Sequence, residues 1–155
     1  MRKRLIDAEI HPQPEADSPN WLDLGSLASV EVTSEHPDFP VESAFTGQVS
    51  GWRANGCGEQ TIRLVFDEPT AVNRIQLRFH ESQIERTHEF TLSYQGQSDS
   101  REIVRQQWSF SPQGSTSEEE NYRVNLSDVI SLELKLKPDL QPERAVASLT
   151  SFRVS

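Results

Sequence analysis

Short runs in which apolar and polar residues alternate constrain the fold of this chain more than any other feature. They fill it from residue 28 to the last residue, most clearly at 61–66, 73–80, 89–94 and 131–137. Successive side chains of a β-strand point to opposite faces, so each run predicts a strand with one face in a core and one in water. No convincing helix is expected. The pattern predicts an all-β, antiparallel sandwich, a class that commonly works through the loops at its ends.

Eight strands are expected, separated by turn-forming or irregular segments. They are predicted at 28–33, 60–66, 71–80, 88–94, 102–110, 121–126, 130–137 and 147–154. A turn is expected at 67–70, where the sequence reads Asp-Glu-Pro-Thr. The polar segment 111–120 is the interior piece expected to be most prone to disorder. The stretch 34–59 contains two prolines and four glycines, and irregular segments of this length are often functional.

The composition fits one folded domain. A chain of 155 residues is long enough to bury a core, and its apolar fraction of 34% with a mean hydropathy of -0.62 suits two β layers with wet outer faces. Three prolines among polar residues predict an extended amino-terminal arm at residues 1–20. Residues 21–155 are then expected to form a single sandwich domain.

The charge and the cysteine content exclude several function classes. A net charge of -9 argues against duplex nucleic acid and anionic membranes, which are both bound mainly through Lys and Arg. Cys57 is the single cysteine, so an internal disulfide is excluded. The basic amino terminus resembles a signal peptide, but Asp7, Glu9 and His11 interrupt its apolar segment. No apolar run is long enough to span a membrane. A cytoplasmic location is expected.

Motifs of the common enzyme classes are missing. The chain has no phosphate-binding glycine loop, no GxSxG and no HExxH, and its four histidines lack metal-ligand spacing with Cys57. His80 and His88 flank a charged loop, which leaves open a metal or acid–base site, with solvated loop ends as the favoured interpretation. The acidic run 118–120 is expected to be a solvated loop rather than a cation site. We therefore expect no catalytic activity.

One segment resembles a known family. Residues 42–55 read ESAFTGQVSGWRAN and lead directly into the strand QTIRLVF, the turn DEPTAV and the strand NRIQLRF. This order resembles the coagulation-factor type C, or discoidin, superfamily of galactose-binding-like jelly rolls. The matching motif positions are Ala44, Phe45, Thr46, Gly47, Ser50 and Trp52. The resemblance covers roughly residues 27–155 and implies a jelly-roll sandwich of about eight strands.

The resemblance also implies what the motif residues do. Many relatives hold a structural calcium with an aspartate and a glutamate, but here Thr46 stands at the first position and Thr150 or Ser151 at the second. Calcium prefers carboxylate oxygens, so no metal or other cofactor is expected. The motif tryptophan of relatives packs in the core. We expect the same of Trp52 and of Trp108, which has the inward parity of its predicted strand.

A candidate ligand site follows from the same comparison. Sugar-binding relatives place a histidine directly after the motif tryptophan, and an arginine and an asparagine in the loop after the third strand. Here Arg53 follows Trp52, and the later loop reads HESQIERTH. The candidate ligand-binding residues are Arg53, Asn55, His80, Glu81, Glu85 and Arg86, with His36 and Asp38 added from the loop that also contains Phe39. Such side chains can hydrogen-bond sugar hydroxyls. Exposed loop-end charges without a ligand are an equally open interpretation.

Two function classes remain. The leading one is a non-catalytic carbohydrate-binding module whose partner is a sugar or glycan. The alternative is an intracellular protein-interaction or assembly module with a protein partner and no sugar ligand. A concave polar pocket beside Arg53 and Arg86 would favour a sugar, whereas a flat apolar patch would favour a protein. Arg74 and Arg78, on the outer face of the third strand, are expected to pair with acidic neighbours across the sheet.

Overall fold

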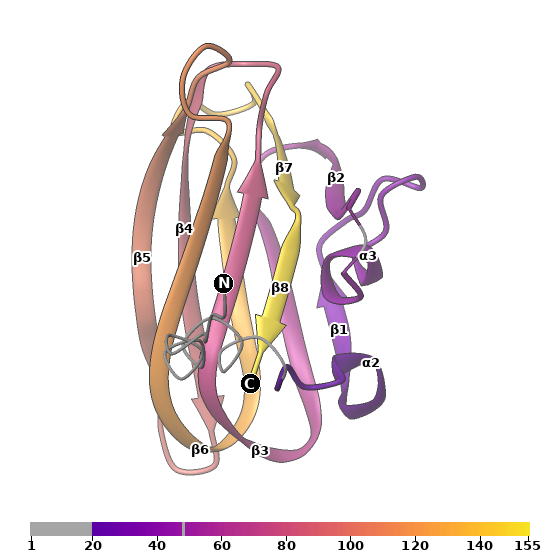
Figure 1. The fold of residues 1–155 in the computed structure, drawn as a ribbon, viewed down its shortest axis with the longest axis vertical. Helices are drawn as coiled ribbons and strands as arrows, with labels where there is room; N and C mark the ends of the chain where they lie inside the picture. Colours follow the sequence, from indigo (N-terminus) through magenta and orange to yellow (C-terminus); the bar gives the residue numbers. More distant parts are fainter. Residues whose placement is uncertain (1–19, 48) are drawn as a thin grey trace, which may run out of the picture.

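The computed structural model describes residues 20–47 and 49–155, which form the predicted all-β sandwich (Figure 1). The arm expected at residues 1–20 lies, except for residue 20, outside the described residues. The described strands are β1 Ala28–Val32, β2 Trp52–Cys57, β3 Gln60–His80, β4 Arg86–Gly96, β5 Ser100–Phe110, β6 Ser117–Lys137, β7 Val146–Leu149 and β8 Ser151–Val154. Two short helices, α2 Leu24–Leu27 and α3 Glu42–Phe45, precede β2.

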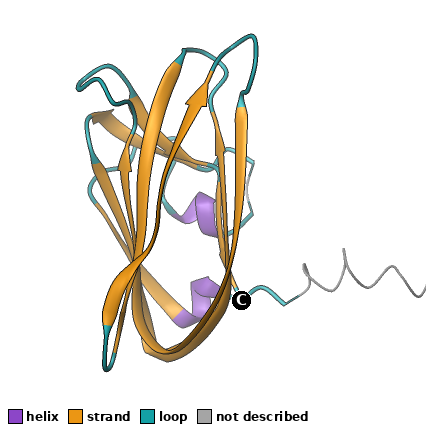
Figure 2. Ribbon diagram, turned by 90° about the vertical axis from the view of Figure 1, so that its left-hand side faces the viewer, coloured by secondary structure: helices purple, strands orange, loops and turns teal. Residues whose placement is uncertain are grey.

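Two long strands, β3 and β6, belong to both layers of the sandwich. The first half of β3 pairs with β1 and with the second half of β6, which in turn pairs with β4, and β4 pairs with β5. The second half of β3 pairs with β8 and with the first half of β6. All of these pairs are antiparallel. The result is a five-stranded layer facing a smaller layer, with β2 and β7 as a separate two-stranded ladder (Figure 2).

The predicted turn at 67–70 and the predicted break at 127–129 are wrong, because β3 and β6 continue through both places. The ladder between them slips in register three times between Val65 and Arg74, and Thr70 still pairs with Val129 inside this region. Pro69 has no N–H to donate and lies where pairing is already interrupted, as prolines within sheets usually do. Such irregularities bend a strand without ending it.

Other predictions also need correction. Residues 117–120, expected to be disorder-prone, begin β6 and pair with the end of β3. The stretch 34–59, expected to be irregular, contains β2, which pairs with β7. The strand predicted at 147–154 is divided at Thr150 into β7 and β8. No helix was expected, and α2 and α3 are single turns of four residues, too short to leave a helical period in the sequence.

The core is built from the inward residues of the alternating runs, as predicted. Leu134 is fully buried and lies in register with Ile62 on one side and Leu92 on the other. The other predicted inward residues are also buried: Leu64, Phe66, Ile75, Leu77, Phe79, Phe90, Tyr94, Leu132 and Leu136. Trp52 is 1% exposed, and its Nε1–H donates to the Ser34 carbonyl at 3.0 Å. Trp108 is only partly buried, against the edge of the core.

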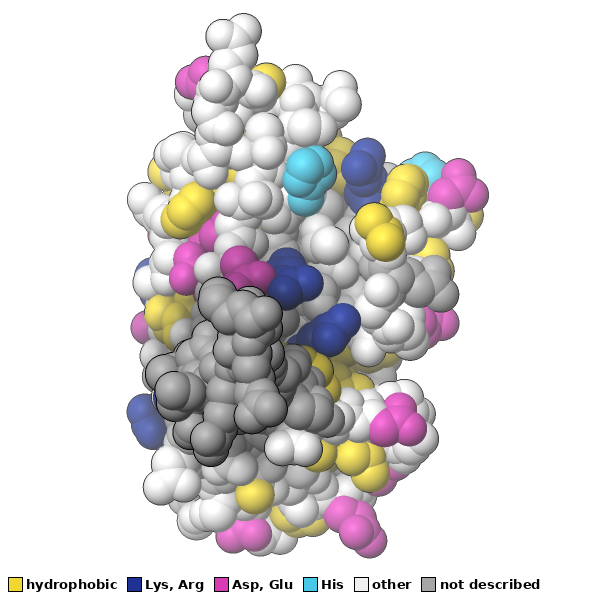
Figure 3. Space-filling view, viewed as in Figure 1, with side chains coloured by type: hydrophobic (Ala, Val, Ile, Leu, Met, Phe, Trp, Pro, Cys, Tyr) yellow, Lys and Arg dark blue, Asp and Glu magenta, His cyan; other side chains and the backbone are white. Residues whose placement is uncertain are grey.

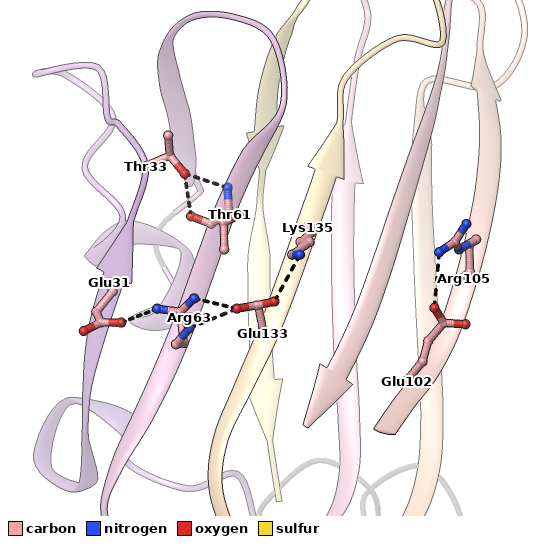
Figure 4. Close-up of polar contacts among 8 residues, drawn as sticks. All are labelled: Glu31, Thr33, Thr61, Arg63, Glu102, Arg105, Glu133 and Lys135. Atoms are coloured by element: carbon pink, nitrogen blue, oxygen red, sulfur yellow. Dashed lines mark hydrogen bonds and ion pairs between the residues drawn. The ribbon is translucent and has the colours of Figure 1, made fainter. Parts of the chain in front are cut away.

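The outer face of the large layer is covered by paired charges. Arg63 bonds Glu31 of β1 and Glu133 of β6, both at 2.7 Å, and Lys135 lies 3.8 Å from Glu133 (Figure 4). Because Arg63 is partly exposed, each pair contributes at most ~1 kcal/mol. The alternation that fills the core thus also keeps this face polar. No helix among the described residues is both long and apolar enough to cross a membrane.

A cluster of ionisable side chains is buried between the layers. His88 of β4 is 1% exposed, and its Nε2 lies 2.7 Å from Glu118 Oε1 of β6. Its ring is enclosed by the rings of Phe79, Phe90 and Phe110. The interpretation of His88 and of the acidic run as solvated loop residues is therefore wrong for His88 and Glu118. Both share the inward parity of their strands.

The cluster continues along β6 toward β5. Glu120, two residues beyond Glu118 on the same face, accepts a hydrogen bond from Gln106, whose Oε1 accepts one from the Tyr122 hydroxyl at 3.0 Å. Burial lowers the pKa of His88 to about 3, with a further contribution from the positive Arg86. Burial, together with the adjacent Glu118, raises the pKa of Glu120 to about 8. At neutral pH His88 is therefore neutral and Glu120 is protonated.

Replacing Leu134 with alanine should lower the free energy of unfolding by about 2–5 kcal/mol, because the fully buried site between Ile62 and Leu92 leaves a cavity. Urea denaturation measures this change. Lys135→Ala is the matched control, since Lys135 is the next residue of β6 and is exposed, and its effect should stay within about 0.5 kcal/mol. Equal losses for the two variants would contradict the assigned faces of β6.

The Glu120 and His88 pKa values predict how stability depends on pH. Glu120 is protonated in the folded protein up to a pKa of about 8 but has an ordinary pKa of 4.5, so its contribution is lost as the pH rises through 4.5–8. The pKa of His88 is about 3 when folded against an ordinary 6.5, so its contribution is lost as the pH falls through 6.5–3. The two slopes oppose each other between 4.5 and 6.5. Above pH 6.5 the decline from Glu120 remains, and Glu118, whose pKa is also raised by burial, acts in the same direction.

We therefore expect the free energy of unfolding to fall between pH 6.5 and 8 in the wild type and to stay flatter in Glu120→Gln. Glutamine keeps a donor toward Glu118 but cannot lose a proton. Urea denaturation at pH 6.5, 7.2 and 8.0 provides the measurement. Glu119→Gln, at the neighbouring exposed position, should retain the decline. A decline of the same size in Glu120→Gln would show that groups other than Glu120 cause the loss of stability.

Candidate functional site

A groove with a volume of about 410 Å³ lies where β2 and β7 meet the end of β3 and the start of β6. We call it the β2–β7 groove. It is lined by Val49, Ser50, Trp52, Arg53, Arg78, Phe79, His80, Ser117, Glu118, Glu119, Ser148, Leu149 and Thr150. Figure 3 shows this face of the molecule, where Arg and His side chains gather around a hollow in the surface. Two predicted ligand-binding residues, Arg53 and His80, are among the lining residues.

The floor of the groove is apolar and belongs to the core. Trp52 pairs with Leu149 across the β2–β7 ladder, and Phe79 pairs with Glu118 across the β3–β6 ladder. The three apolar residues of these pairs are at most 2% exposed. Their strands therefore hold the polar residues at the rim on a rigid base.

The rim near β7 is shaped by the loop that enters β2. Gly51 has φ 64°, and a Cβ there would lie 2.5 Å from the Leu149 carbonyl oxygen and 2.7 Å from Thr150 Cα. Only glycine therefore allows this backbone conformation and this close approach to β7. The approach positions Val49 and Ser50 at the groove, and Val49 is 92% exposed.

Arg53 is exposed but held in place. Its guanidinium lies 4.8 Å from the centre of the Phe39 ring, and the His36 ring contacts Phe39 edge-on at 5.5 Å. The backbone of the same loop is tied to β2, because the His36 N–H donates to the Arg53 carbonyl at 2.8 Å and the Arg53 N–H donates to the Phe39 carbonyl at 3.2 Å. Asp38 is exposed and donates its N–H to His36 Nδ1 at 3.1 Å. Within the described ranges, no carboxylate lies within ion-pair distance of Arg53.

The opposite rim comes from β3 and β6. His80, the last residue of β3, is exposed and pairs with Ser117. Arg78 donates from Nε to Glu119 Oε1 at 2.7 Å, and both side chains are about half exposed. The predicted pairing of Arg78 with an acidic neighbour across the sheet is thus confirmed. Arg74 lies with its guanidinium 4.8 Å from the centre of the Trp21 ring.

Glu81 and Arg86 lie together, but their hydrogen bonds are made with other parts of the protein and with each other. Arg86 is 4% exposed and donates to Glu81 Oε1 and to the Pro138 carbonyl, both at 2.7 Å. Glu81 Oε2 also accepts the N–H groups of Gln83 and Ile84. Burial alone would raise the pKa of Glu81, but these bonds and the arginine outweigh it and lower the pKa. The interpretation of Arg86 as an exposed loop-end charge is wrong.

The remaining predicted residues lie outside the groove lining. The Asn55 side chain is exposed, and its backbone N–H donates to Ser34 Oγ at 3.1 Å. Glu85 is exposed, and its carbonyl accepts a bond from Arg144 at 2.8 Å. His36 and Asp38 contribute to the loop that supports Arg53 rather than to the lining.

Several lining residues could not be singled out from the sequence. Ser148 and Thr150 reach the groove only because β7 pairs with β2, and Arg78 reaches it only because β3 ends beside the start of β6. Val49 carries a weak signal as an isolated apolar residue between polar and glycine residues. Within the described ranges, no group of three or more His, Cys, Asp or Glu residues is arranged to hold a metal ion.

Comparisons with known proteins identify the fold. No protein-family model matches the chain, and no curated protein matches it. Solved structures do. The CBM32 of AlyQ in complex with 4,5-unsaturated mannuronic acid has a TM-score of 0.63 at 17% identity, covering 88% of this chain and 98% of that one.

Two modules from Clostridium perfringens are similar to the same degree. One is CpGH89CBM32-5 in complex with GalNAc-β-1,3-galactose, with a TM-score of 0.62, 17% identity and coverage of 87% of this chain and 99% of that one. The other is the family 32 module of NanJ in complex with galactose, with a TM-score of 0.62, 11% identity and coverage of 86% and 96%. The predicted galactose-binding-like sandwich is thereby confirmed, and the chain has the fold of the family 32 carbohydrate-binding modules.

Proposed function

We propose that the protein is a non-catalytic carbohydrate-binding module that holds a glycan in the β2–β7 groove. The observation that supports this most directly is the groove itself, a concave surface with an apolar floor and a rim of hydrogen-bonding side chains fixed on strands. Ligand sites of this kind combine apolar walls with a few well-placed polar groups. The similar solved modules bind galactose, GalNAc-β-1,3-galactose and an unsaturated mannuronic acid, and all have this fold.

The lining residues supply the chemistry that a sugar requires. Arg53 and His80 offer N–H donors, while the hydroxyls of Ser50, Ser148 and Thr150 can donate and accept. Exposed Val49 offers an apolar contact for the C–H face of a sugar ring. Water can complete the hydrogen bonds that the protein does not make directly.

The described surface favours a sugar over a protein partner. The large apolar side chains exposed within the described ranges are Leu27, Val49 and Leu140, and each comes from a different segment. Isolated apolar residues are normal on a surface, whereas a contiguous patch marks an interface. A concave groove with an apolar floor and a polar rim beside Arg53 is the feature that favours the sugar.

Arg53→Ala should weaken glycan binding at least about tenfold, because it removes a fixed charge-assisted donor from the rim. A glycan array followed by calorimetry on the glycans that bind provides the measurement. Arg105→Ala is the matched control, since Arg105 is an exposed arginine on the outer face of β5 (Figure 4). Both variants should unfold at the wild-type temperature. Absence of binding to every glycan, together with a protein partner recovered by pull-down, would instead support the interaction module.

Gly51→Ala tests the part played by the loop. An alanine at φ 64° is strained by about 1–2 kcal/mol, and its Cβ would displace the loop that positions Val49 and Ser50. We expect lower stability and weaker glycan binding. Gly58→Ala is the control, because Gly58 has φ 106° but open space around a Cβ. It should lose stability without losing affinity, and equal losses of affinity would exclude a role for the loop in binding.

A further inference from the structure

We propose that the β2–β7 groove selects glycans that bear a carboxylate, such as those containing uronic acids. This inference rests on the proposed function and specifies its substrate class. It is argued from the distribution of charge, the positioning of Arg53 and the balance of hydrogen-bond donors and acceptors in the groove.

The groove is less acidic than the chain as a whole. The net charge of the chain is -9, whereas the groove is lined by two arginines and a histidine beside two glutamates. Of the two carboxylates in the lining, Glu119 is engaged at both oxygens, whereas Glu118 has a partner for Oε1 and none, within the described residues, for its buried Oε2. Glu119 accepts from Arg78 at 2.7 Å, and buried Glu118 lies 2.7 Å from His88.

Arg53 is the cation available to a ligand. Its guanidinium is positioned by the Phe39 ring and has no ion-pair partner within the described ranges. The bonds between β2 and the His36–Phe39 loop hold the backbone at both residues, so the stacking partner is fixed relative to the arginine. Within the described residues the side-chain N–H groups of Arg53 make no hydrogen bond, so the N–H edge of the guanidinium is available to a ligand. That edge matches the two oxygens of a carboxylate, which it can bind in a bidentate manner.

The exposed rim of the groove is rich in hydrogen-bond donors. Arg53 and His80 add donors there, whereas Glu119 is used internally and the unpartnered Oε2 of Glu118 is buried. Even the Ser148 hydroxyl faces a donor, since Arg86 Nη2 lies 3.5 Å from its oxygen. Sugar hydroxyls both donate and accept, so a neutral sugar can accept from this rim but finds few acceptors there for its own hydroxyl protons. A carboxylate only accepts, and it forms the stronger, charge-assisted bonds.

The test compares each acidic oligosaccharide with its carboxyl-reduced, neutral form. Oligogalacturonate and oligomannuronate are titrated against the wild type by calorimetry, each beside its reduced counterpart. We expect the acidic form to bind at least about tenfold tighter, as one charge-assisted hydrogen bond contributes. In Arg53→Ala the ratio of the two affinities should fall toward one, while Arg105→Ala should keep the wild-type ratio. A ratio does not depend on the folded fraction of a variant.

The outcomes separate this inference from the proposed function. Equal binding of acidic and reduced forms, or binding on the array only to neutral glycans, would overturn the selectivity and leave the carbohydrate-binding function intact. Failure to bind any acidic or neutral glycan would overturn both. A preference for acidic glycans that survives in Arg53→Ala would show that another group recognises the carboxylate, and would contradict the role given to Arg53.

Discussion

The pairing of β3 with β6 is the constraint on which the rest of the structure depends. Each strand is 21 residues long and takes part in both layers, so their ladder joins the layers directly. The register of this ladder places Ile62 opposite Leu134 and Leu77 opposite Glu120. A shift of one residue would turn every inward side chain of one strand toward solvent. The core, the buried cluster and the groove all require this one register.

The groove follows from where the two strands end. Because β3 ends at His80 and β6 begins at Ser117 in register with it, the rims from the two strands lie side by side. The β2–β7 ladder then closes the other side, with Arg53 opposite Ser148. The polar rim is therefore held by strand pairing rather than by flexible loops alone. Fixed donors lose little conformational entropy when a ligand binds.

Much of this fold could be predicted, and the failures have physical causes. Alternation identified the core, and the motif around Trp52 identified the fold. Arg53, predicted beside that motif as a ligand residue, lies in the lining of the groove. The turn predicted around Pro69 from its composition was wrong, because a strand can bend and continue through residues that usually end it. The sequence did indicate that His88 is buried, because His88 has the same parity as Phe90 and Leu92. The charged residues of the preceding loop led instead to the interpretation of a solvated loop end. The contributions of Arg78 and Ser148 depend on tertiary pairing, which no local pattern encodes.

The polar residues around the groove differ in whether their hydrogen bonds are already made within the fold. Arg86 and Glu81 pair beneath the surface, and His88 bonds one oxygen of Glu118 deeper in the core. Buried charges and polar groups must be paired, so these residues are committed to stability and unavailable to a ligand. At the rim, Arg78 forms an ion pair with Glu119. What remains is Arg53 on Phe39, exposed and fixed, so any preference of the groove for an anionic group must arise chiefly there.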